Sequence, residues 1–164
     1  YYRDGEKVGF VISVSAGDQV RIDMAQIAAQ ELEEIGMDVS VEIPAQTDWA
    51  GQMAFLIGWG SPFDADDHTY KVFGTDKGAN YSGYSNADVD KYLTEARQSA
   101  DPEVRAEAYA NFQKALAEDP AYAMICYIDA NYVADSNIKG IDPDTIMGHH
   151  GVGIFWNVAD WTIE

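Results

Sequence analysis

The sequence predicts an α/β fold with a mostly parallel sheet and helices on both faces. Two observations predict it: short apolar runs alternate with segments of helical periodicity, and turn residues separate them. The composition is that of a globular protein, because 47% of the residues are hydrophobic and 12% are aromatic. A chain of 164 residues can bury one core of ordinary size. We therefore expect a single domain over residues 1–164.

The first third of the chain predicts a strand, a helix and a second strand. Residues 10–14 form an apolar, β-branched run that is typical of a buried strand. Asp18 is suited to cap a helix and Gly36 to end it. Residues 37–43 then alternate apolar and polar side chains until Pro44. The apolar residues that recur at helical spacing, and that we expect to face inward, are Val20, Met24, Ala28, Leu32 and Ile35.

A third strand is expected at residues 54–59, after an unusually short connection. Residues 46–52 leave too little room for an ordinary crossover helix, although a parallel crossover normally takes about a dozen residues. The glycines and proline of residues 58–62 indicate a sharp turn at the end of this strand. Trp59 is therefore placed at the mouth of a strand.

Two further helices carry clear start signals. Asn86 is expected to cap the first helix, whereas Asp101 caps the second and Pro102 occupies its first turn. Asp119 and Pro120 end the second helix. The side chains expected to face inward are Val89, Tyr92, Leu93 and Ala96 on the first helix and Val104, Ala108, Phe112 and Ala115 on the second.

Residues 121–134 form a long apolar stretch that predicts one strand or two adjacent strands. Cys126, the single cysteine, lies in this stretch, and we expect a buried structural thiol rather than a nucleophile. One cysteine cannot form an internal disulfide, so the redox compartment stays open. The tail beyond is rich in glycine and irregular.

The chain is strongly acidic, with 28 acidic and 10 basic side chains and a formal net charge of -18. Such a surface repels phosphate backbones and anionic lipids, so nucleic acid is not an expected partner. The acidity either favours cationic ligands or serves solubility, and composition does not decide between the two. No apolar run is long enough for a membrane span, and the sequence itself contains no basic-then-apolar signal segment. We expect the chain to be a piece of a longer protein.

The acidic cluster of residues 64–68 is the best site candidate by position. Ligands of parallel α/β sheets bind beyond the carboxyl ends of the strands, and this cluster follows the third strand. It is either a loop that contacts a ligand or a solvated acidic turn. A calcium loop is excluded because Thr69 and Thr75 stand where glycine and glutamate are required. A catalytic pair of carboxylates is disfavoured, since nothing in the sequence separates their two pKa values.

Other site chemistry finds little support in the sequence. Ser61 is followed by proline rather than by the residues of a nucleophile elbow, and residues 78–83 lack the lysine of a P-loop. Three histidines, His68, His149 and His150, could bind a transition metal, but solvated side chains are the favoured interpretation. No cofactor is predicted. Trp59 is equally consistent with a ligand-facing wall and with a core residue.

Two motifs occur in order along the chain: Ile-Gly-Trp at residues 57–59 with the acidic stretch after it, and Asn-Tyr-Ser-Gly-Tyr-Ser-Asn at residues 80–86. Weaker patterns lie at residues 30–39, 113–116, 119–121, 138–140 and 155–157, and at Arg105 and Tyr109. Taken together, these segments resemble the peptide and nickel solute-binding proteins of ABC importers, known as extracellular solute-binding protein family 5. The likeness spans nearly the whole chain.

The resemblance implies a type II periplasmic-binding-protein lobe, specifically the carboxy-terminal lobe of a two-lobed protein. It implies a binding protein rather than an enzyme, which takes up oligopeptides or dipeptides in a cleft between its lobes. The alternatives are a nickel or metallophore-complex binder of the same family and, in another class, a carboxylate-dependent hydrolase. The implied partners are a membrane ABC permease and the missing amino-terminal lobe. The implied location is periplasmic or extracellular, as a lipoprotein anchored at the cell surface.

The resemblance also implies a set of ligand-binding residues. Asp64 occupies the position at which the α-amino group of a peptide would be received. Pro62 stands where many peptide binders have an aspartate, and this form is closer to the nickel-type branch of the family. No metal ligand is predicted. The residues expected to line the cleft are Gly58, Trp59, Phe63, Asp64 and Asp67.

Overall fold

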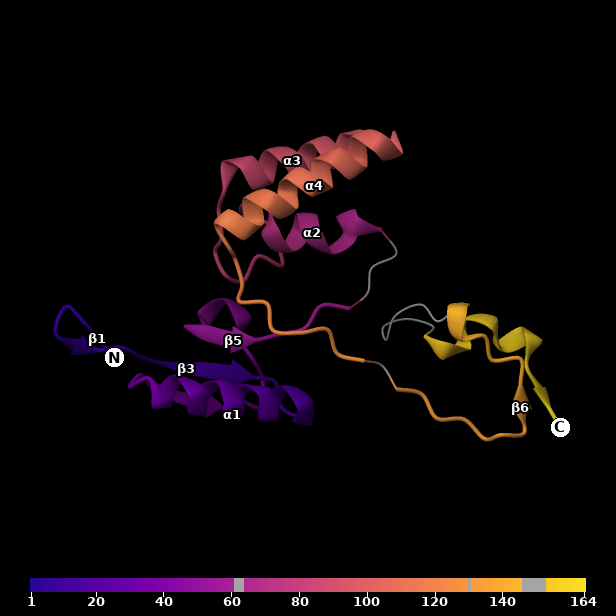
Figure 1. The fold of residues 1–164 in the computed structure, drawn as a ribbon, viewed down its shortest axis with the longest axis horizontal. Helices are drawn as coiled ribbons and strands as arrows, with labels where there is room; N and C mark the ends of the chain where they lie inside the picture. The colour runs from indigo at the N-terminus through magenta and orange to yellow at the C-terminus, as the bar shows by residue number, and fades with distance from the viewer. Residues whose placement is uncertain (61–63, 130, 146–152) are drawn as a thin grey trace. The chain divides into compact units, whose positions relative to one another are not determined.

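The computed structural model describes residues 1–60, 64–129, 131–145 and 153–164. The chain divides into two units, Tyr1–Gly58 and Trp59–Glu164, and each has its own hydrophobic cluster (Figure 1). The boundary falls within the turn that contains the Ile-Gly-Trp pattern. The expectation of one domain over the whole chain stays a prediction.

A three-stranded parallel sheet is the centre of the first unit. Its strands are β3 (Gly9–Val14), β4 (Asp38–Glu42) and β5 (Ala54–Leu56), in the order β4-β3-β5. This confirms the predicted α/β class with a parallel sheet. Strand β5 is shorter than expected, because its ladder partner β3 ends at Val14, which pairs with Leu56.

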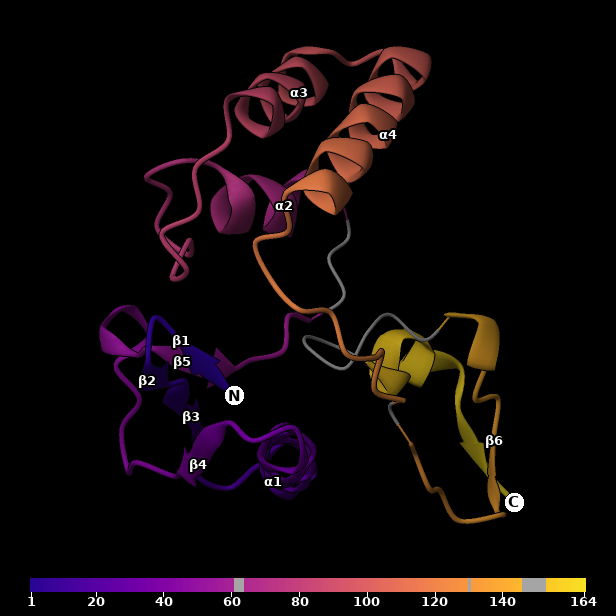
Figure 2. The same ribbon diagram turned by 60° about the vertical axis from the view of Figure 1, so that its left-hand side comes forward.

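Helix α1 (Gln19–Glu34) connects β3 to β4 and packs against both strands (Figure 2). As predicted, Asp18 caps the helix by accepting a hydrogen bond from the Arg21 backbone N–H at 3.1 Å. Gly36 follows the helix with a φ of 87°, a conformation that glycine adopts without strain. The buried residues of this core are Ile12, Val14, Ile22, Ala25, Ala29 and Val39.

The predicted inward stripe of α1 is wrong at both ends. Val20 is 51% exposed and Ile35 is 62% exposed. The helix carries two apolar stripes, and the sheet packs against the one that contains Ala25 and Ala29. Two alanines let a helix approach a sheet closely, so this face packs with less empty space.

The two remaining connections of the first unit are short. Strands β1 (Tyr2–Arg3) and β2 (Glu6–Lys7) form an antiparallel hairpin. The link from β4 to β5 contains only a 3₁₀ turn, η1 (Trp49–Gly51), which confirms that residues 46–52 hold no ordinary crossover helix.

The described part of the second unit contains three α-helices: α2 (Ala65–Phe73), α3 (Ala87–Gln98) and α4 (Pro102–Glu118). Helices α3 and α4 lie side by side, and α2 packs against α3 (Figure 2). The predicted caps are confirmed, since Asn86 and Asp101 accept hydrogen bonds from the first turns of α3 and α4. The buried cluster consists of Val89, Leu93 and Phe112.

Two predictions for this unit are wrong. Residues 64–68 are not a loop but the cap and first turn of α2, because Asp64 and the acidic first turn stabilise a helix amino terminus. Val104 is 46% exposed and lies outside the core, since Ala108 and Phe112 are the α4 residues that are buried.

The stretch 121–134 contains no strand among its described residues. Cys126 is exposed, so the prediction of a buried thiol is wrong for this chain. The reason is that no described strand lies beside the stretch to cover it. Beyond it, β6 (Ile138–Lys139) pairs antiparallel with β7 (Thr162–Ile163), and the 3₁₀ segments η2 (Pro143–Thr145) and η3 (Ile154–Asp160) lie between them in the sequence.

Candidate functional site

Gly58 ends the first unit, and the guanidinium group of Arg21 lies against it. A Cβ atom added at Gly58 would meet the guanidinium group of Arg21, so a larger residue there would require this flexible side chain to move. Arg21 forms an ion pair with Asp18, the residue that caps α1. The amino terminus of α1 therefore contacts Gly58, the residue immediately before Trp59.

Trp59 belongs to an aromatic cluster within the second unit. Its ring stacks on Tyr81 with centroids 6.1 Å apart and an interplanar angle of 17°. The His68 ring lies 5.8 Å away on a tilted plane. Trp59 is half-buried, so the indole is neither sealed in a core nor fully free. Part of the ring is therefore accessible to solvent.

Asp64 joins two helices. One carboxylate oxygen accepts a hydrogen bond from the Asp66 backbone N–H at 2.8 Å, which caps α2. Both oxygens accept from Nη2 of Arg105 on α4 at 2.7 Å. The Asp66 N–H and then the Arg105 guanidinium hold the pKa of Asp64 below its usual value, whereas Asp64 raises the pKa of Arg105. The Asp64 side chain is still 59% exposed, so its carboxylate is ionised and reachable from solvent.

Asp67 lies in the first turn of α2 and is also ion-paired. Its carboxylate is 3.0 Å from the ammonium of Lys71 and 3.7 Å from Nε2 of His68. The hydrogen bond from Lys71 is the main cause that lowers the pKa of Asp67. His68 thus contacts both Asp67 and the Trp59 ring, which links the acidic turn to the aromatic cluster.

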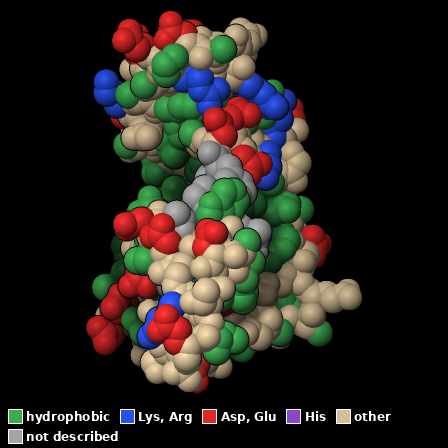
Figure 3. All heavy atoms as spheres, turned by 90° about the vertical axis from the view of Figure 1, so that its right-hand side faces the viewer, with side chains coloured by type: hydrophobic (Ala, Val, Ile, Leu, Met, Phe, Trp, Pro, Cys, Tyr) green, Lys and Arg blue, Asp and Glu red, His purple; other side chains and the backbone are tan. Residues whose placement is uncertain are grey.

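Arg97 of α3 completes this charged surface. Its Nε lies 3.5 Å from Asp66, and its guanidinium carbon lies 4.1 Å from the centre of the Tyr70 ring. In Figure 3 the Lys and Arg side chains gather on the part formed by α2, α3 and α4, next to acidic side chains. The acidic first turn of α2 is therefore balanced by arginines from the two helices beside it.

The loop that presents Tyr81 is held by one amide side chain. Asn80 donates from Nδ2 to the carbonyl oxygens of Gly74 at 2.9 Å and Tyr84 at 2.7 Å. Its Oδ1 accepts from the Tyr84 backbone N–H at 3.0 Å and from the Ser82 hydroxyl at 3.2 Å. The hydroxyl of Tyr84 donates in turn to the carbonyl oxygen of Asp119 at 2.9 Å. The Asn-Tyr-Ser-Gly-Tyr-Ser-Asn tract is thus a loop whose side chains fix its own backbone.

The structure brings together three of the five residues predicted for the site. Trp59, Asp64 and Asp67 lie in the second unit, whereas Gly58 is the last residue of the first. Phe63 lies outside the described residues, as do Ser61, Pro62, His149 and His150. Sequence reasoning quoted Tyr81 and Arg105 only as part of the family resemblance. No sequence signal pairs Arg105 with Asp64, because the two lie far apart along the chain.

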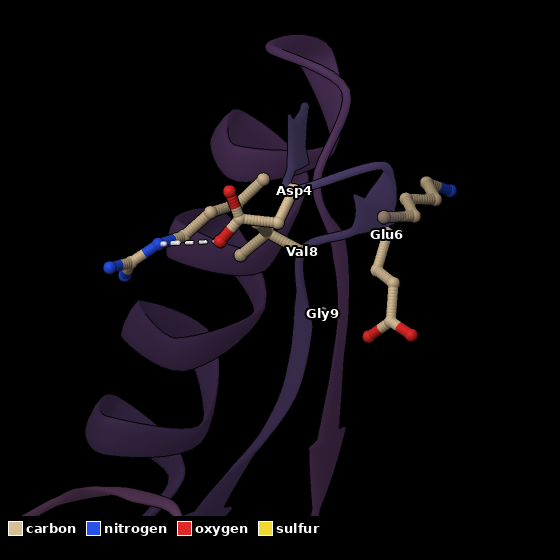
Figure 4. Close-up of a pocket in the computed structure, with 6 residues that line it drawn as sticks. Asp4, Glu6, Val8 and Gly9 are labelled. Carbon is tan, nitrogen blue, oxygen red and sulfur yellow. Dashed lines mark ion pairs between the residues drawn. The ribbon is translucent and has the colours of Figure 1, made fainter.

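A surface hollow lies elsewhere, at the β1–β2 hairpin (Figure 4). It has a volume of about 490 Å³ and is lined by exposed charged residues, among which Arg3 and Asp4 lie 4.0 Å apart. None of the predicted site residues lines it. Within the described residues, no group of three or more side chains could hold a metal ion.

Comparison with curated proteins gives two long matches, and no family model matches the chain. Protein XP55 of Streptomyces lividans is 35% identical over 146 residues, which cover 85% of this chain and 27% of that protein. The oligopeptide-binding protein AppA of Bacillus subtilis is 26% identical over an alignment of 170 residues, gaps included, which covers 97% of this chain and 30% of AppA. The chain therefore spans about a third or less of the length of these relatives.

Two solved structures of other proteins have the same fold as this chain over nearly its whole length. NikZ from Campylobacter jejuni in complex with Ni(L-His) superposes with a TM-score of 0.81 and 35% identity, over 98% of this chain and 34% of NikZ. The structural neighbours of this chain are peptide and nickel solute-binding proteins of ABC importers, as the resemblance in the sequence predicted. AppA from B. subtilis in complex with a nonapeptide shares the fold of this chain, with a TM-score of 0.71 and 23% identity over 99% of this chain and 33% of AppA. The predicted family and the type II periplasmic-binding-protein lobe are both confirmed.

Proposed function

We propose that this chain is the carboxy-terminal lobe of the substrate-binding component of an ABC importer. The complete protein binds oligopeptides or dipeptides between two lobes. The observation that carries the proposal is the match to an oligopeptide-binding protein over 97% of this chain. The complete protein then closes on its ligand by hinge motion and delivers it to a membrane permease. It acts in the periplasm or outside the cell, held at the surface by a lipid anchor. No helix in the described part of the chain has the length and apolar character that crossing a bilayer needs.

In this proposal the ligand contacts Trp59 and the residues near it. Trp59 offers a half-buried indole that stacks on apolar or cationic parts of a ligand. Asp64 and Asp67 are carboxylates at neutral pH, because hydrogen bonds lower the pKa of each. A peptide amino group would share Asp64 with Arg105 rather than bind an isolated charge. Gly58 and Phe63 complete the proposed contact surface.

The experiment is calorimetry on the complete protein, with a set of dipeptides and oligopeptides as ligands. Trp59→Ala is expected to weaken the binding of a peptide that binds the wild type by on the order of tenfold to a hundredfold, as for a buried aromatic contact. Trp156→Ala is the matched control, because Trp156 is a 54% exposed tryptophan of η3 outside the proposed surface. Equal affinities for the wild type and Trp59→Ala would refute the contact surface. Absence of binding for every peptide would refute the peptide proposal.

Nickel-chelate uptake is the second candidate function. It is favoured by the 35% identity with NikZ, a protein solved with Ni(L-His). Elemental analysis of the complete protein, purified after growth with nickel and histidine, separates the two candidates. One nickel ion per protein molecule, with no bound peptide, would favour nickel-chelate uptake and contradict peptide uptake.

We further propose that the protein has no hydrolytic activity, so the carboxylate-dependent hydrolase is the disfavoured alternative. Both oxygens of Asp64 accept hydrogen bonds from Arg105, an arrangement that keeps the carboxylate ionised rather than poised to transfer a proton. Incubation of the complete protein with peptides and glycosides is expected to give no product. Turnover that disappears in Asp64→Ala would contradict this.

A further inference from the structure

His68 lies beside Trp59 in the aromatic cluster of the second unit. The centres of the two rings are 5.8 Å apart, and Nε2 of His68 lies 3.7 Å from a carboxylate oxygen of Asp67. The His68 side chain is 23% exposed, and its Nδ1 is buried without a hydrogen-bond partner among the described residues. Histidine is the type of side chain whose charge ordinarily changes between about pH 5 and pH 8. A proton gained by His68 therefore places a positive charge next to the indole of Trp59.

Two charged groups of α2 face this histidine. Asp67 is a carboxylate in weak acid, because the hydrogen bond from Lys71 is the main cause that lowers its pKa. It attracts an imidazolium, as does the face of the Trp59 ring. The ammonium of Lys71, 3.0 Å from the same carboxylate, repels one. A protonated His68 thus shares Asp67 with Lys71 and leaves less of its negative charge for any other cation.

The neighbouring elements contribute further charged and titratable groups, and their arginines are already paired. On α3, Arg97 lies 3.5 Å from a carboxylate oxygen of Asp66. On α4, Arg105 donates to Asp64 at 2.7 Å. The loop between α2 and α3 contributes Tyr81, whose ring stacks on Trp59. Among the described residues of this surface, the one histidine is His68, so it is the side chain of the type that changes charge in weak acid.

We propose that His68 makes the binding of ligands with a cationic group pH-dependent, with tighter binding when His68 is neutral. This rests on the proposed function, in which Trp59, Asp64 and Asp67 contact the ligand. The protonated ring repels the amino group of a peptide at this surface, and it competes with that group for Asp67 and for the indole. The neutral ring does neither. Because such coupling is reciprocal, a cationic ligand that binds in weak acid releases a proton from His68.

Tryptophan fluorescence of the complete protein without ligand tests the contact between His68 and Trp59. The signal of Trp59 is obtained as the difference between the wild type and Trp59→Phe, measured from about pH 8 to about pH 5. This difference is expected to change with pH in the wild type, because a charge appears beside the indole, and to stay constant in the His68→Gln background. A Trp59 signal that does not change with pH would overturn the proposal. A signal that changes equally in the His68→Gln background would overturn it as well.

Calorimetry on the complete protein, with a dipeptide or oligopeptide that has a free amino group, tests the effect on binding. The wild type is expected to bind on the order of five- to tenfold more weakly at about pH 5.5 than at about pH 7.5. His68→Gln has no proton to gain and is expected to change by less than about twofold between the same two pH values.

His68→Lys is the matched variant, because its amine keeps a positive charge at both pH values. It is expected to bind at neutral pH as weakly as the wild type binds in acid. Equal pH dependence in the wild type and His68→Gln, or tighter binding of the wild type in acid, would overturn the proposal. Absence of peptide binding at neutral pH refutes the proposed function, whereas peptide binding that does not depend on His68 refutes this inference alone.

Discussion

At the scale of single residues, the pair of Asp64 and Arg105 is the contact that most affects the site. Arg105→Gln removes the donor to both carboxylate oxygens but leaves the hydrogen bond from the Asp66 N–H. The pKa of Asp64 is lowered in the folded protein, so the stabilisation is present above its ordinary value of 3.8 and is lost as pH falls through the folded pKa. The stability difference between wild type and Arg105→Gln is therefore expected to be positive at pH 7 and to vanish in strong acid.

Urea unfolding at a series of pH values from neutral to acidic checks this expectation. Lys114→Gln is the control, because Lys114 is an exposed cation on the same helix. Both groups of the pair face solvent, so the effect should also decrease with added salt. A difference that stays constant down to the lowest pH would exclude ionised Asp64 as its source.

Asn80 carries the second prediction at this scale. Asn80→Ala removes four hydrogen bonds in a partly buried loop and leaves the carbonyl oxygens of Gly74 and Tyr84 without this donor. The expected loss of unfolding free energy is about 2–3 kcal/mol, the cost of leaving such groups unsatisfied. Gln98→Ala, an exposed amide on α3, is expected to change stability by less than about 0.5 kcal/mol. Equal midpoints for the two variants in urea would show that Asn80 does not hold the loop.

Local chemistry explains which residues the sequence made predictable. Asp18, Asn86 and Asp101 are caps whose partners lie two or three residues away, so each could be identified from its neighbours. Asp64 is a cap of the same kind, but the aspartates after it indicated an acidic loop instead. Arg105 could not be assigned, because its contact with Asp64 exists only once α2 and α4 have packed.

At the scale of elements, the packing of α3 on α4 decides whether the second unit folds. Leu93 is 1% exposed in the cluster with Val89 and Phe112. Leu93→Ala is expected to lower the unfolding free energy by about 2–5 kcal/mol, the usual cost of a large-to-small change in a core. Val104→Ala, at a 46% exposed position on α4, is expected to cost less than about 1 kcal/mol. Chemical denaturation of both variants checks the difference. Similar losses of unfolding free energy would contradict the burial of Leu93 and the exposure of Val104.

Periodicity predicted that these elements exist more reliably than it predicted which faces they bury. Helix α1 has one apolar stripe with Val20 and another with Ala25, and only the sheet beside it selects between them. Residues 121–134 have the composition of strands, yet a strand needs a neighbour, and none lies beside them among the described residues. Composition cannot supply a neighbour that another segment must provide.

At the scale of the whole molecule, the proposed cleft needs surfaces that this chain does not contain. Binding sites usually enclose most of a small ligand, and one wall encloses far less. The isolated chain is therefore expected to bind, at least on the order of a hundredfold more weakly, any peptide that the complete protein binds. Calorimetry on both proteins measures this, with circular dichroism to show that the isolated chain is folded. Tight, stoichiometric binding by the isolated chain would refute a cleft shared between two lobes.

The family was predictable at this scale because several short motifs occur in a fixed order along the chain. Ile-Gly-Trp at residues 57–59 and the tract at residues 80–86 are each short, and their combination is specific. The ligand was not predictable. In the proposed contact surface, Trp59 would provide stacking and Asp64 negative charge, and both a peptide amino group and a cationic metal chelate would satisfy these two requirements.

The position of β3 in the sheet has a consequence for biosynthesis. This central strand pairs with β4 on one side and β5 on the other, and both neighbours follow it in the sequence, the later one ending at Leu56. All the hydrogen-bonding partners of this sheet have therefore been translated before the first residue of α2 is added. The sheet and α1 therefore need no later segment of this chain to assemble, in keeping with the amino-to-carboxyl order in which nascent chains fold.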